Sequence, residues 1–265
     1  MYELRQGNAV KKLLTMFAIT VVPVALVAFA SASMVAAAGP SFAGTWNLNY
    51  AKSQLTGQTA TISKSASGGL HFDSGGWAYD FDLNGKEYPT PDGRTVACRA
   101  VNATTWEITG RMKGKVLATY QQTVNGDLLT SVADLVKPDG SVTKQTSTST
   151  RISGGPGFLG TWKSTEVKGA PTSIEITIEG QNGITLKTPE GQTVCKGSFD
   201  GKDYPLSEFG VVSKETLAFV RTGANAFKVT TKLNGKPFYI DVYTLSADGK
   251  TLTDDGNAVS NKINI

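Results

Sequence analysis

Short runs in which apolar and polar residues alternate recur along the chain from residue 44 onwards. Three isoleucines alternate with Glu and Thr in Ile174–Glu179, and Trp77–Leu83 alternates large apolar residues with Ala and Asp. Because successive side chains of a strand point to opposite faces, each run indicates a strand with one buried and one wet face. No stretch after residue 38 places apolar residues at helical spacing. The pattern therefore predicts an all-β protein.

Turn signals separate these runs at regular intervals. Asn-Gly and Asp-Gly pairs, which favour tight hairpins, begin at Asn84, Asp92, Asn125, Asp139, Asn182, Asp200, Asn234 and Asp248. Between the turns, the first half of the chain offers nine candidate strands: Gly44–Tyr50, Thr59–Lys64, Leu70–Asp73, Trp77–Leu83, Thr95–Val101, Thr105–Arg111, Lys115–Val124, Leu128–Val136 and Val142–Ile152. Sequential hairpins without long crossovers favour an up-and-down meander that closes into a barrel and so removes its exposed edges.

The chain contains two related copies of one unit. Each copy opens with Gly-Thr-Trp, at Gly44–Trp46 and at Gly160–Trp162. The spacing between these motifs also separates Tyr88 from Tyr204, each of which lies in a Gly-Lys-(Glu/Asp)-Tyr-Pro segment. A repeat of this length indicates a duplicated domain, and a feature shared by both copies is more often structural than functional.

The repeat predicts two tandem barrels with a linker between them. We expect the first barrel over residues 39–153 and the second over residues 158–265. Residues 154–157 (Gly-Gly-Pro-Gly) form the expected flexible linker. A phosphate-binding loop is the alternative for this glycine-rich segment, but such a loop needs a helix after it, whereas a strand follows here.

The first 38 residues have the features of a signal peptide. Arg5, Lys11 and Lys12 precede an apolar run from Leu13 to Ala30, and small residues follow the run. A retained membrane anchor is the alternative, which the proline inside the run and two small-residue cleavage sites disfavour. We predict cleavage after residue 38, no stable membrane span afterwards, and a periplasmic or secreted protein.

Overall charge gives little support for a nucleic-acid partner. The chain has 26 basic and 22 acidic residues, a formal net charge of +4. Cleavage of the signal peptide removes three basic residues and one acidic residue, which leaves a nearly neutral protein without a clustered basic face. Nucleic-acid binding is therefore not expected, and the sequence leaves the oligomeric state open.

The residues that usually carry catalysis are scarce. The single histidine, His71, alternates with Leu70 and Phe72 and so faces solvent. Cys98 and Cys195 each stand where the other copy has an apolar or aromatic residue, which predicts two buried, unbridged thiols. One histidine and two scattered cysteines do not make a zinc site.

Two further segments resemble catalytic or metal-binding motifs by their letters alone. Ser141 and Lys144 match a Ser-x-x-Lys motif, but on a strand residues three apart point to opposite faces. Asp254–Asn257 has two adjacent carboxylates but lacks the alternating oxygen ligands of a calcium loop, and we expect a turn there. The sequence therefore predicts a protein that is not an enzyme and that has no cofactor and no metal.

Gly-x-Trp at the start of the first strand, before an antiparallel barrel, resembles the calycins, which include lipocalins and fatty-acid-binding proteins. The second copy, Phe158–Lys163, is especially similar to the start of a fatty-acid-binding protein, and the repeated Gly-Lys-(Glu/Asp)-Tyr-Pro resembles exported bacterial proteins with lipocalin-like repeats. The resemblance implies that each tryptophan closes a barrel floor beneath a basic residue of the last strand. The residues implied in this structural motif are Gly44, Trp46, Arg151, Gly160, Trp162 and Lys262.

The barrel interiors are the remaining place for function. The candidate ligand-lining residues are Trp77, Tyr79, Phe81, Tyr120, Phe219, Arg221 and Tyr243. Core filling is the alternative for the aromatic residues, and a position at the solvent-exposed rim is the alternative for Arg221. We expect an exported binding protein that holds a small apolar or amphipathic ligand in one or both barrels. The alternative is a structural or protein-interaction module whose barrels are filled.

Overall fold

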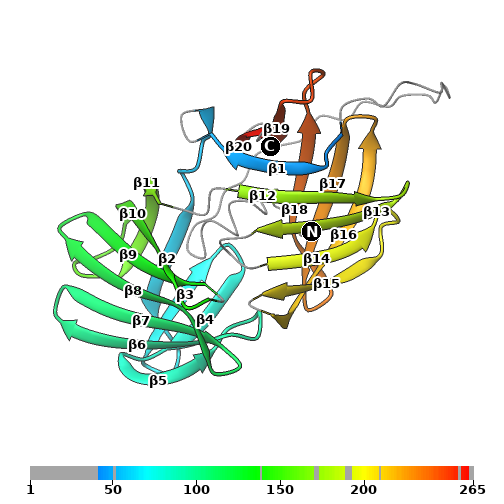
Figure 1. Cartoon of the computed structure of the whole chain (residues 1–265). Coiled ribbons are helices and arrows are strands. Elements are labelled where there is room, and N and C mark those ends of the chain that lie inside the picture. Colours follow the sequence, from blue (N-terminus) through cyan, green and yellow to red (C-terminus); the bar gives the residue numbers. More distant parts are fainter. Residues whose placement is uncertain are drawn as a thin grey trace.

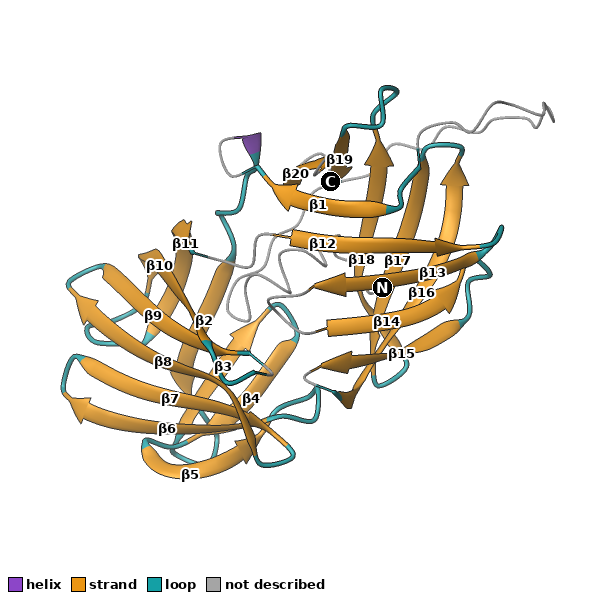
Figure 2. Ribbon diagram, viewed as in Figure 1, coloured by secondary structure: helices purple, strands orange, loops and turns teal. Residues whose placement is uncertain are grey.

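The computed structural model describes residues 41–49, 52–137, 139–169, 173–188, 193–208, 210–255 and 258–262, and the signal peptide predicted at 1–38 lies outside them. These residues form two antiparallel, barrel-like sheets, which confirms the predicted all-β class (Figures 1 and 2). No helix in the described ranges is long and apolar enough to cross a membrane.

The first barrel is a ten-stranded sheet in the order β4-β3-β2-β11-β10-β9-β8-β7-β6-β5. Its edge strands β4 and β5 approach each other without hydrogen-bonded pairing, so that the sheet is nearly closed. Its strands are β2 (Thr59–Lys64), β3 (Leu70–Ser74), β4 (Trp77–Phe81), β5 (Asn84–Pro89), β6 (Thr95–Asn102), β7 (Thr105–Met112), β8 (Lys115–Asn125), β9 (Leu128–Val136), β10 (Val142–Ser153) and β11 (Gly160–Lys168).

The second barrel is closed, in the order β1-β12-β13-β14-β15-β16-β17-β18-β19-β20, with β1 paired to both β12 and β20. Its strands are β1 (Gly44–Leu48), β12 (Ser173–Glu179), β13 (Gly183–Thr188), β14 (Thr193–Ser198), β15 (Asp203–Glu208), β16 (Val211–Gly223), β17 (Ala226–Leu233), β18 (Lys236–Leu245), β19 (Thr251–Asp254) and β20 (Ala258–Lys262).

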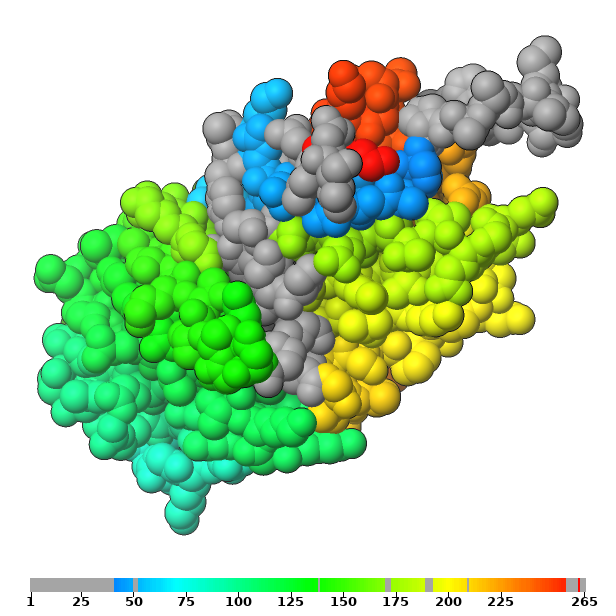
Figure 3. Space-filling model, in the orientation of Figure 1, coloured from blue at the N-terminus to red at the C-terminus, as the bar shows by residue number. Residues whose placement is uncertain are grey.

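The barrels do not follow the predicted division at residues 39–153 and 158–265. Strand β1 belongs to the first sequence copy but lies in the second barrel. Strand β11 opens the second copy but lies in the first barrel, between β2 and β10. Figure 3 shows β1, in blue, on the lobe built from the second copy, while β11, in light green, lies on the other lobe. The first barrel is therefore one continuous stretch of chain, inserted between β1 and β12 of the second.

The segment at 154–157, predicted as an interdomain linker, instead connects β10 to β11 inside the first barrel. A Cβ atom on Gly154 would lie 2.3 Å from the Cα atom of Gly160, so the two strand ends touch at their backbones. The backbone of Gly160, with φ of +140°, also belongs to the region that favours glycine. A short connection between two paired strands is a hairpin loop, which explains why a glycine-rich segment is needed here.

Residues Asn84–Pro89 form strand β5, although a turn is predicted at Asn84 and Gly85. A register shift between Asn84 and Glu87 accommodates this Asn-Gly pair. The turn that joins β17 to β18 follows the prediction. Asn234 and Gly235 have φ of 51° and 77°, the positive values that a tight two-residue hairpin requires.

Each barrel encloses one apolar core. The core of the first barrel includes Trp162 from the second copy, and the core of the second barrel includes Trp46 from the first copy. Both tryptophans are at most 2% exposed. The alternation in Ile174–Glu179 places Ile174 and Ile176 in the second core, as predicted.

Candidate functional site

The two Gly-Thr-Trp strands build equivalent floors in the two barrels. In the first barrel, the indole N–H of Trp162 donates to the carbonyl of Phe158 at 2.9 Å, and the Arg151 guanidinium lies 4.1 Å from the ring centre. In the second barrel, the indole N–H of Trp46 donates to Phe42 at 2.8 Å, and Lys262 Nζ lies 5.2 Å from the ring centre. A cation over an indole face is an attractive contact. Each floor therefore joins a tryptophan of one copy to a basic residue of the other.

Glycine is needed at the start of both strands. Gly44 has φ of +142°, and a Cβ there would lie 2.7 Å from Lys262 Cε. A Cβ on Gly160 would lie 2.3 Å from the carbonyl oxygen of Ser153. The Gly-Thr-Trp motif thus has a structural role at the floor of each barrel. This role explains why both copies contain the motif.

Aromatic side chains occupy the interior of the first barrel. The predicted lining residues Trp77, Tyr79, Phe81 and Tyr120 are all at most 6% exposed. The Tyr79 ring centre lies 5.1 Å from that of Trp77 and 5.6 Å from that of Phe81. Burial raises the pKa of Tyr120 to about 12. These four residues pack as core and do not line the cavity described below.

The predicted lining residues of the second barrel separate into two groups. Phe219 and Tyr243 lie in its core, at 0% and 1% exposure. Arg221 is exposed near the end of β16, and its guanidinium lies 4.2 Å from the ring centre of Phe199. Arg221 therefore holds a position at the rim.

An open cavity of about 430 Å³ lies at the floor end of the first barrel. Its walls come from the β2–β3 turn, the β4–β5 connection, the β6–β7 turn and the segment before β11. The lining residues are Lys64, Gly68, Gly69, Leu70, Asp82, Leu83, Ala100, Asn102, Ala103, Trp106, Phe158 and Leu159.

The cavity combines an apolar wall with polar groups. Trp106 and Phe158 stack at 3.7 Å between ring centres with an interplanar angle of 15°. The exposed side chains of Lys64, Asp82 and Asn102 supply a cation, a carboxylate and an amide. Phe158 and Leu159 come from the second copy, whereas the other lining residues come from the first. The site is therefore not recognisable from the sequence of either copy alone.

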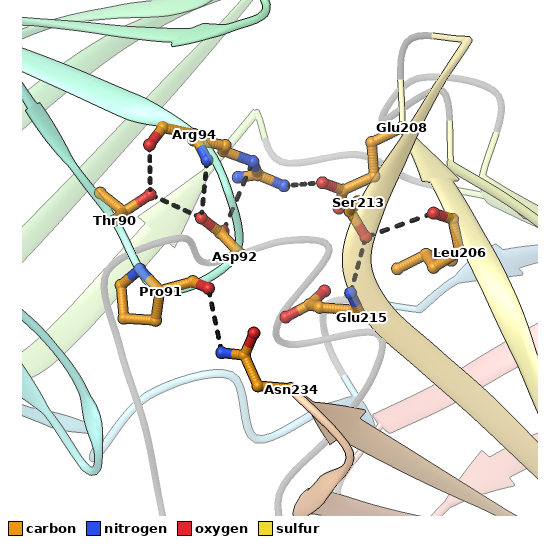
Figure 4. A network of polar contacts seen from close by, with 9 residues as sticks. All are labelled: Thr90, Pro91, Asp92, Arg94, Leu206, Glu208, Ser213, Glu215 and Asn234. Atoms are coloured by element: carbon orange, nitrogen blue, oxygen red, sulfur yellow. Dashed lines mark hydrogen bonds and ion pairs between the residues drawn. The ribbon is translucent and has the colours of Figure 1, made fainter.

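A buried polar network joins the two barrels (Figure 4). Arg94, directly before β6, forms an ion pair with Glu208 of β15, and its Nε lies 3.5 Å from Asp92 Oδ2. The Thr90 hydroxyl donates to Asp92 Oδ1 at 2.5 Å, and the Asn234 amide donates to the Pro91 carbonyl at 3.3 Å.

Electrostatics keep Arg94 charged in this network. Burial acts to lower the pKa of Arg94, but the carboxylates of Glu208 and Asp92 outweigh it and raise the pKa above its ordinary value. Arg94, Asp92 and Glu208 are each at most 5% exposed. The network therefore holds the barrels together, and nothing in the sequence pattern singled it out.

The remaining residues considered for catalysis lie apart from one another. His71 Nδ1 lies 2.6 Å from Asp80 Oδ1 on the partly exposed face of the β3–β4 hairpin. Cys98 and Cys195 are buried and unbridged in separate cores, and burial raises the pKa of each thiol to about 12. Among the described residues, these groups do not share one site.

Comparison with protein-family models, curated proteins and solved structures gives no match. The resemblance to lipocalin-like proteins therefore stays an expectation from the sequence.

Proposed function

We propose that this chain is an exported, non-enzymatic binding protein that holds a small apolar or amphipathic molecule in the cavity at the floor end of the first barrel. The observation that carries the proposal is the cavity itself, which places a stacked aromatic wall beside an exposed lysine, Lys64. Lipocalin-like resemblance and the predicted signal peptide support the same class of function.

The size and chemistry of the cavity define the expected ligand. A volume of about 430 Å³ lies within the roughly 300–1,000 Å³ typical of small-molecule sites. Stacked Trp106 and Phe158 favour a flat or aliphatic body, and Lys64 favours an anionic head group at the opening. Asp82 and Asn102 add hydrogen-bonding partners for polar substituents. An amphipathic anion fits this combination best.

The test uses an anionic naphthalene-sulfonate dye and a variant that fills the cavity. We expect saturable dye fluorescence with one site per chain. Ala103→Trp, which adds bulk to the exposed β6–β7 turn at the cavity, should weaken binding roughly tenfold or more, since the added ring occupies the ligand's space. Ala224→Trp is the matched control, because Ala224 has the equivalent turn position in the second barrel.

The positive charge of Lys64 provides a second test of dye binding. Lys64→Gln should weaken binding of the anionic dye and leave binding of a neutral apolar dye unchanged. Absence of saturable binding, or an equal effect of the two tryptophan variants, would contradict the proposed site.

A structural or interaction module with filled barrels is the second candidate. The observation that favours it is the contact among the interior aromatic residues of the first barrel, where ring centres of Phe72, Tyr79 and Phe81 lie 5.4 to 5.6 Å from their neighbours. This candidate predicts no small-molecule binding in the dye experiment and capture of a protein partner by the barrel surface.

A further inference from the structure

The floor end of the second barrel is built from the same elements that surround the cavity in the first barrel. Ala100 of β6 pairs directly with Trp106 of β7. In the second barrel, Arg221 of β16 pairs in the same way with Phe227 of β17. The sequence separation between Ala100 and Arg221 equals that between Trp106 and Phe227. The lining positions of the two barrels can therefore be compared one by one.

Two further positions correspond in the same manner. Phe158 in the first barrel and Phe42 in the second each lie two residues before a Gly-Thr-Trp strand. Leu83 directly precedes the Asn-Gly-Lys segment of the first copy, and Phe199 directly precedes the Asp-Gly-Lys segment of the second. The cavity residues Leu83 and Ala100 thus correspond to Phe199 and Arg221 of the second barrel.

Large side chains fill these two positions in the second barrel. The ring centre of Phe199 lies 5.5 Å from that of Phe227, so the Phe199 ring packs onto the core. The Arg221 guanidinium lies 4.2 Å from the centre of the Phe199 ring. A cation over a ring face is attractive, and the apolar stem of an arginine can cover apolar surface while its head stays in contact with water. Arg221, which is exposed, therefore covers the floor end of its barrel.

Smaller side chains occupy the same positions in the first barrel. Leu83 has no aromatic ring, and Ala100 has a single methyl group where the second barrel has an arginine. Both residues line the open cavity of about 430 Å³. The position of the cavity is therefore explained by side-chain size at these two positions.

The polar lining also differs between the barrels. Three polar residues of the cavity have small or apolar counterparts, which strand pairing and the neighbouring residues identify: Lys64, Asp82 and Asn102 correspond to Ile178, Ser198 and Gly223. A feature that only one copy has is not required by the shared fold. The charged lining is thus specific to the open cavity.

We propose that Phe199 and Arg221 close in the second barrel the site that Leu83 and Ala100 leave open in the first. These four residues then determine which barrel takes a ligand. In the second barrel this volume holds two flat groups in contact, a ring and a guanidinium. The ligand class that fits the open cavity is accordingly a flat apolar body with a polar edge, and not a flexible alkyl chain.

This inference rests on the proposed function for the ligand in the first barrel, but the closure of the second barrel can be measured separately. The sequence analysis treats Arg221 as a candidate ligand-binding residue. Its contact with Phe199 gives it the opposite role, because its side chain takes the place that a ligand would occupy.

The test counts binding sites for the neutral fluorescent probe N-phenyl-1-naphthylamine on the protein after removal of the predicted signal peptide. The parent protein should bind one probe per chain. The double variant Phe199→Leu, Arg221→Ala opens the second barrel and should bind two. The reciprocal double variant Leu83→Phe, Ala100→Arg should weaken binding roughly tenfold or more, because the added ring and guanidinium occupy the space of the probe.

Matched variants separate closure from a general effect of charge or stability. Arg99→Ala is the control, because Arg99 precedes Ala100 and forms an exposed ion pair with Glu107, and this variant should still bind one probe. Arg221→Ala alone replaces the double variant if the latter does not fold, since removal of an exposed side chain leaves the core intact. It should bind the second probe more weakly than the double variant.

The inference is wrong if the parent already binds two probes, or if the folded Phe199→Leu, Arg221→Ala and Arg221→Ala variants bind no more probe than the parent. Parental affinity of the folded reciprocal variant would also overturn it. A different result separates the two proposals. If the parent binds no probe while the second-barrel variant binds one, the ligand site proposed in the first barrel is wrong and the closure of the second barrel is supported.

Discussion

The guanidinium of Arg151 lies 4.1 Å from the ring centre of Trp162, although the two residues belong to different sequence copies. Arg151 also donates to the carbonyls of Leu159 and Gly157, both at 2.6 Å. Lys262 and Trp46 make the corresponding contact in the second barrel with the copies reversed. The first strand of each copy thus completes the barrel formed by the other, and the basic residue beneath it fixes the junction.

Substitution of Arg151, whose guanidinium donates to two backbone carbonyls, tests this junction. Arg151→Lys retains the positive charge but cannot reach two carbonyls at once, so we expect a loss of about 1–3 kcal/mol in the free energy of unfolding. Urea unfolding monitored by tryptophan fluorescence gives the value. Arg99→Lys is the control, because Arg99 makes an exposed ion pair with Glu107 and its change should remain below about 1 kcal/mol. Equal effects of the two variants would show that Arg151 contributes only a surface charge.

Fragment stability tests the division of the chain. Residues 52–169 contain every strand of the first barrel, from β2 to β11. This fragment should fold with a cooperative thermal transition, whereas the fragment 39–153, which ends at the sequence repeat, lacks β11 and should be less stable. Circular dichroism of both fragments measures the difference. A more stable 39–153 fragment would support two barrels divided at the repeat boundary.

The sequence predicts the strands better than it predicts their partners. Alternation identifies Trp77–Phe81 and Ile174–Glu179 because burial of one face determines which residue types occur there. The partner of a strand is not encoded in its alternation. Strand β11 follows β10 and precedes β12 with short connections on both sides, so a hairpin with either is locally possible. Strands β1 and β11 both begin with Gly-Thr-Trp, so this motif does not indicate which of the two barrels each strand joins.

The candidate sites depend on the same long-range arrangement. Trp106 and Phe158 stack across copies. Arg94 and Glu208 are far apart in the sequence, and only the packing of the two barrels brings them together. Sequence patterns indicate which side chains face inward, but they do not show which of these side chains contact one another.

The ion pair between Arg94 and Glu208 predicts coupling between the barrels. Glu208→Gln removes one charge of a buried pair, and the expected cost is about 3 kcal/mol, because the Arg94 charge stays buried with less compensation. Calorimetry should show a lower melting temperature or two separated transitions. Glu179→Gln is the control, since Glu179 pairs with the exposed Lys196, and it should cost less than about 1 kcal/mol. Unchanged unfolding of Glu208→Gln would show that the barrels are joined by other contacts.

The buried thiols predict a loss of stability at alkaline pH. Burial raises the pKa of Cys98 and Cys195 from 9.0 to about 12. Above pH 9 the unfolded chain releases thiol protons that the folded chain retains, so the free energy of unfolding falls as the pH rises toward 12 and is unaffected below pH 9.

Urea unfolding between pH 8 and pH 11 measures this effect. The double variant Cys98→Ala, Cys195→Ala should show a weaker fall, with the remaining slope due to buried tyrosines such as Tyr120, whose pKa is also raised. The native thiols should react with an alkylating reagent much more slowly than the unfolded ones. Rapid alkylation of the folded protein would contradict the buried positions of both cysteines.

Hydrogen exchange of Trp46→Ala tests most directly the claim that each Gly-Thr-Trp strand completes the opposite barrel. Truncating a fully buried tryptophan costs about 3–5 kcal/mol, which is large compared with the stability of one barrel. Because β1 pairs with β12 and β20, the variant should lose amide protection throughout β12–β20 and retain it in β2–β11. Trp162→Ala should give the reverse pattern. Loss of protection in β2–β10 on changing Trp46, with β12–β20 intact, would contradict the strand arrangement described here.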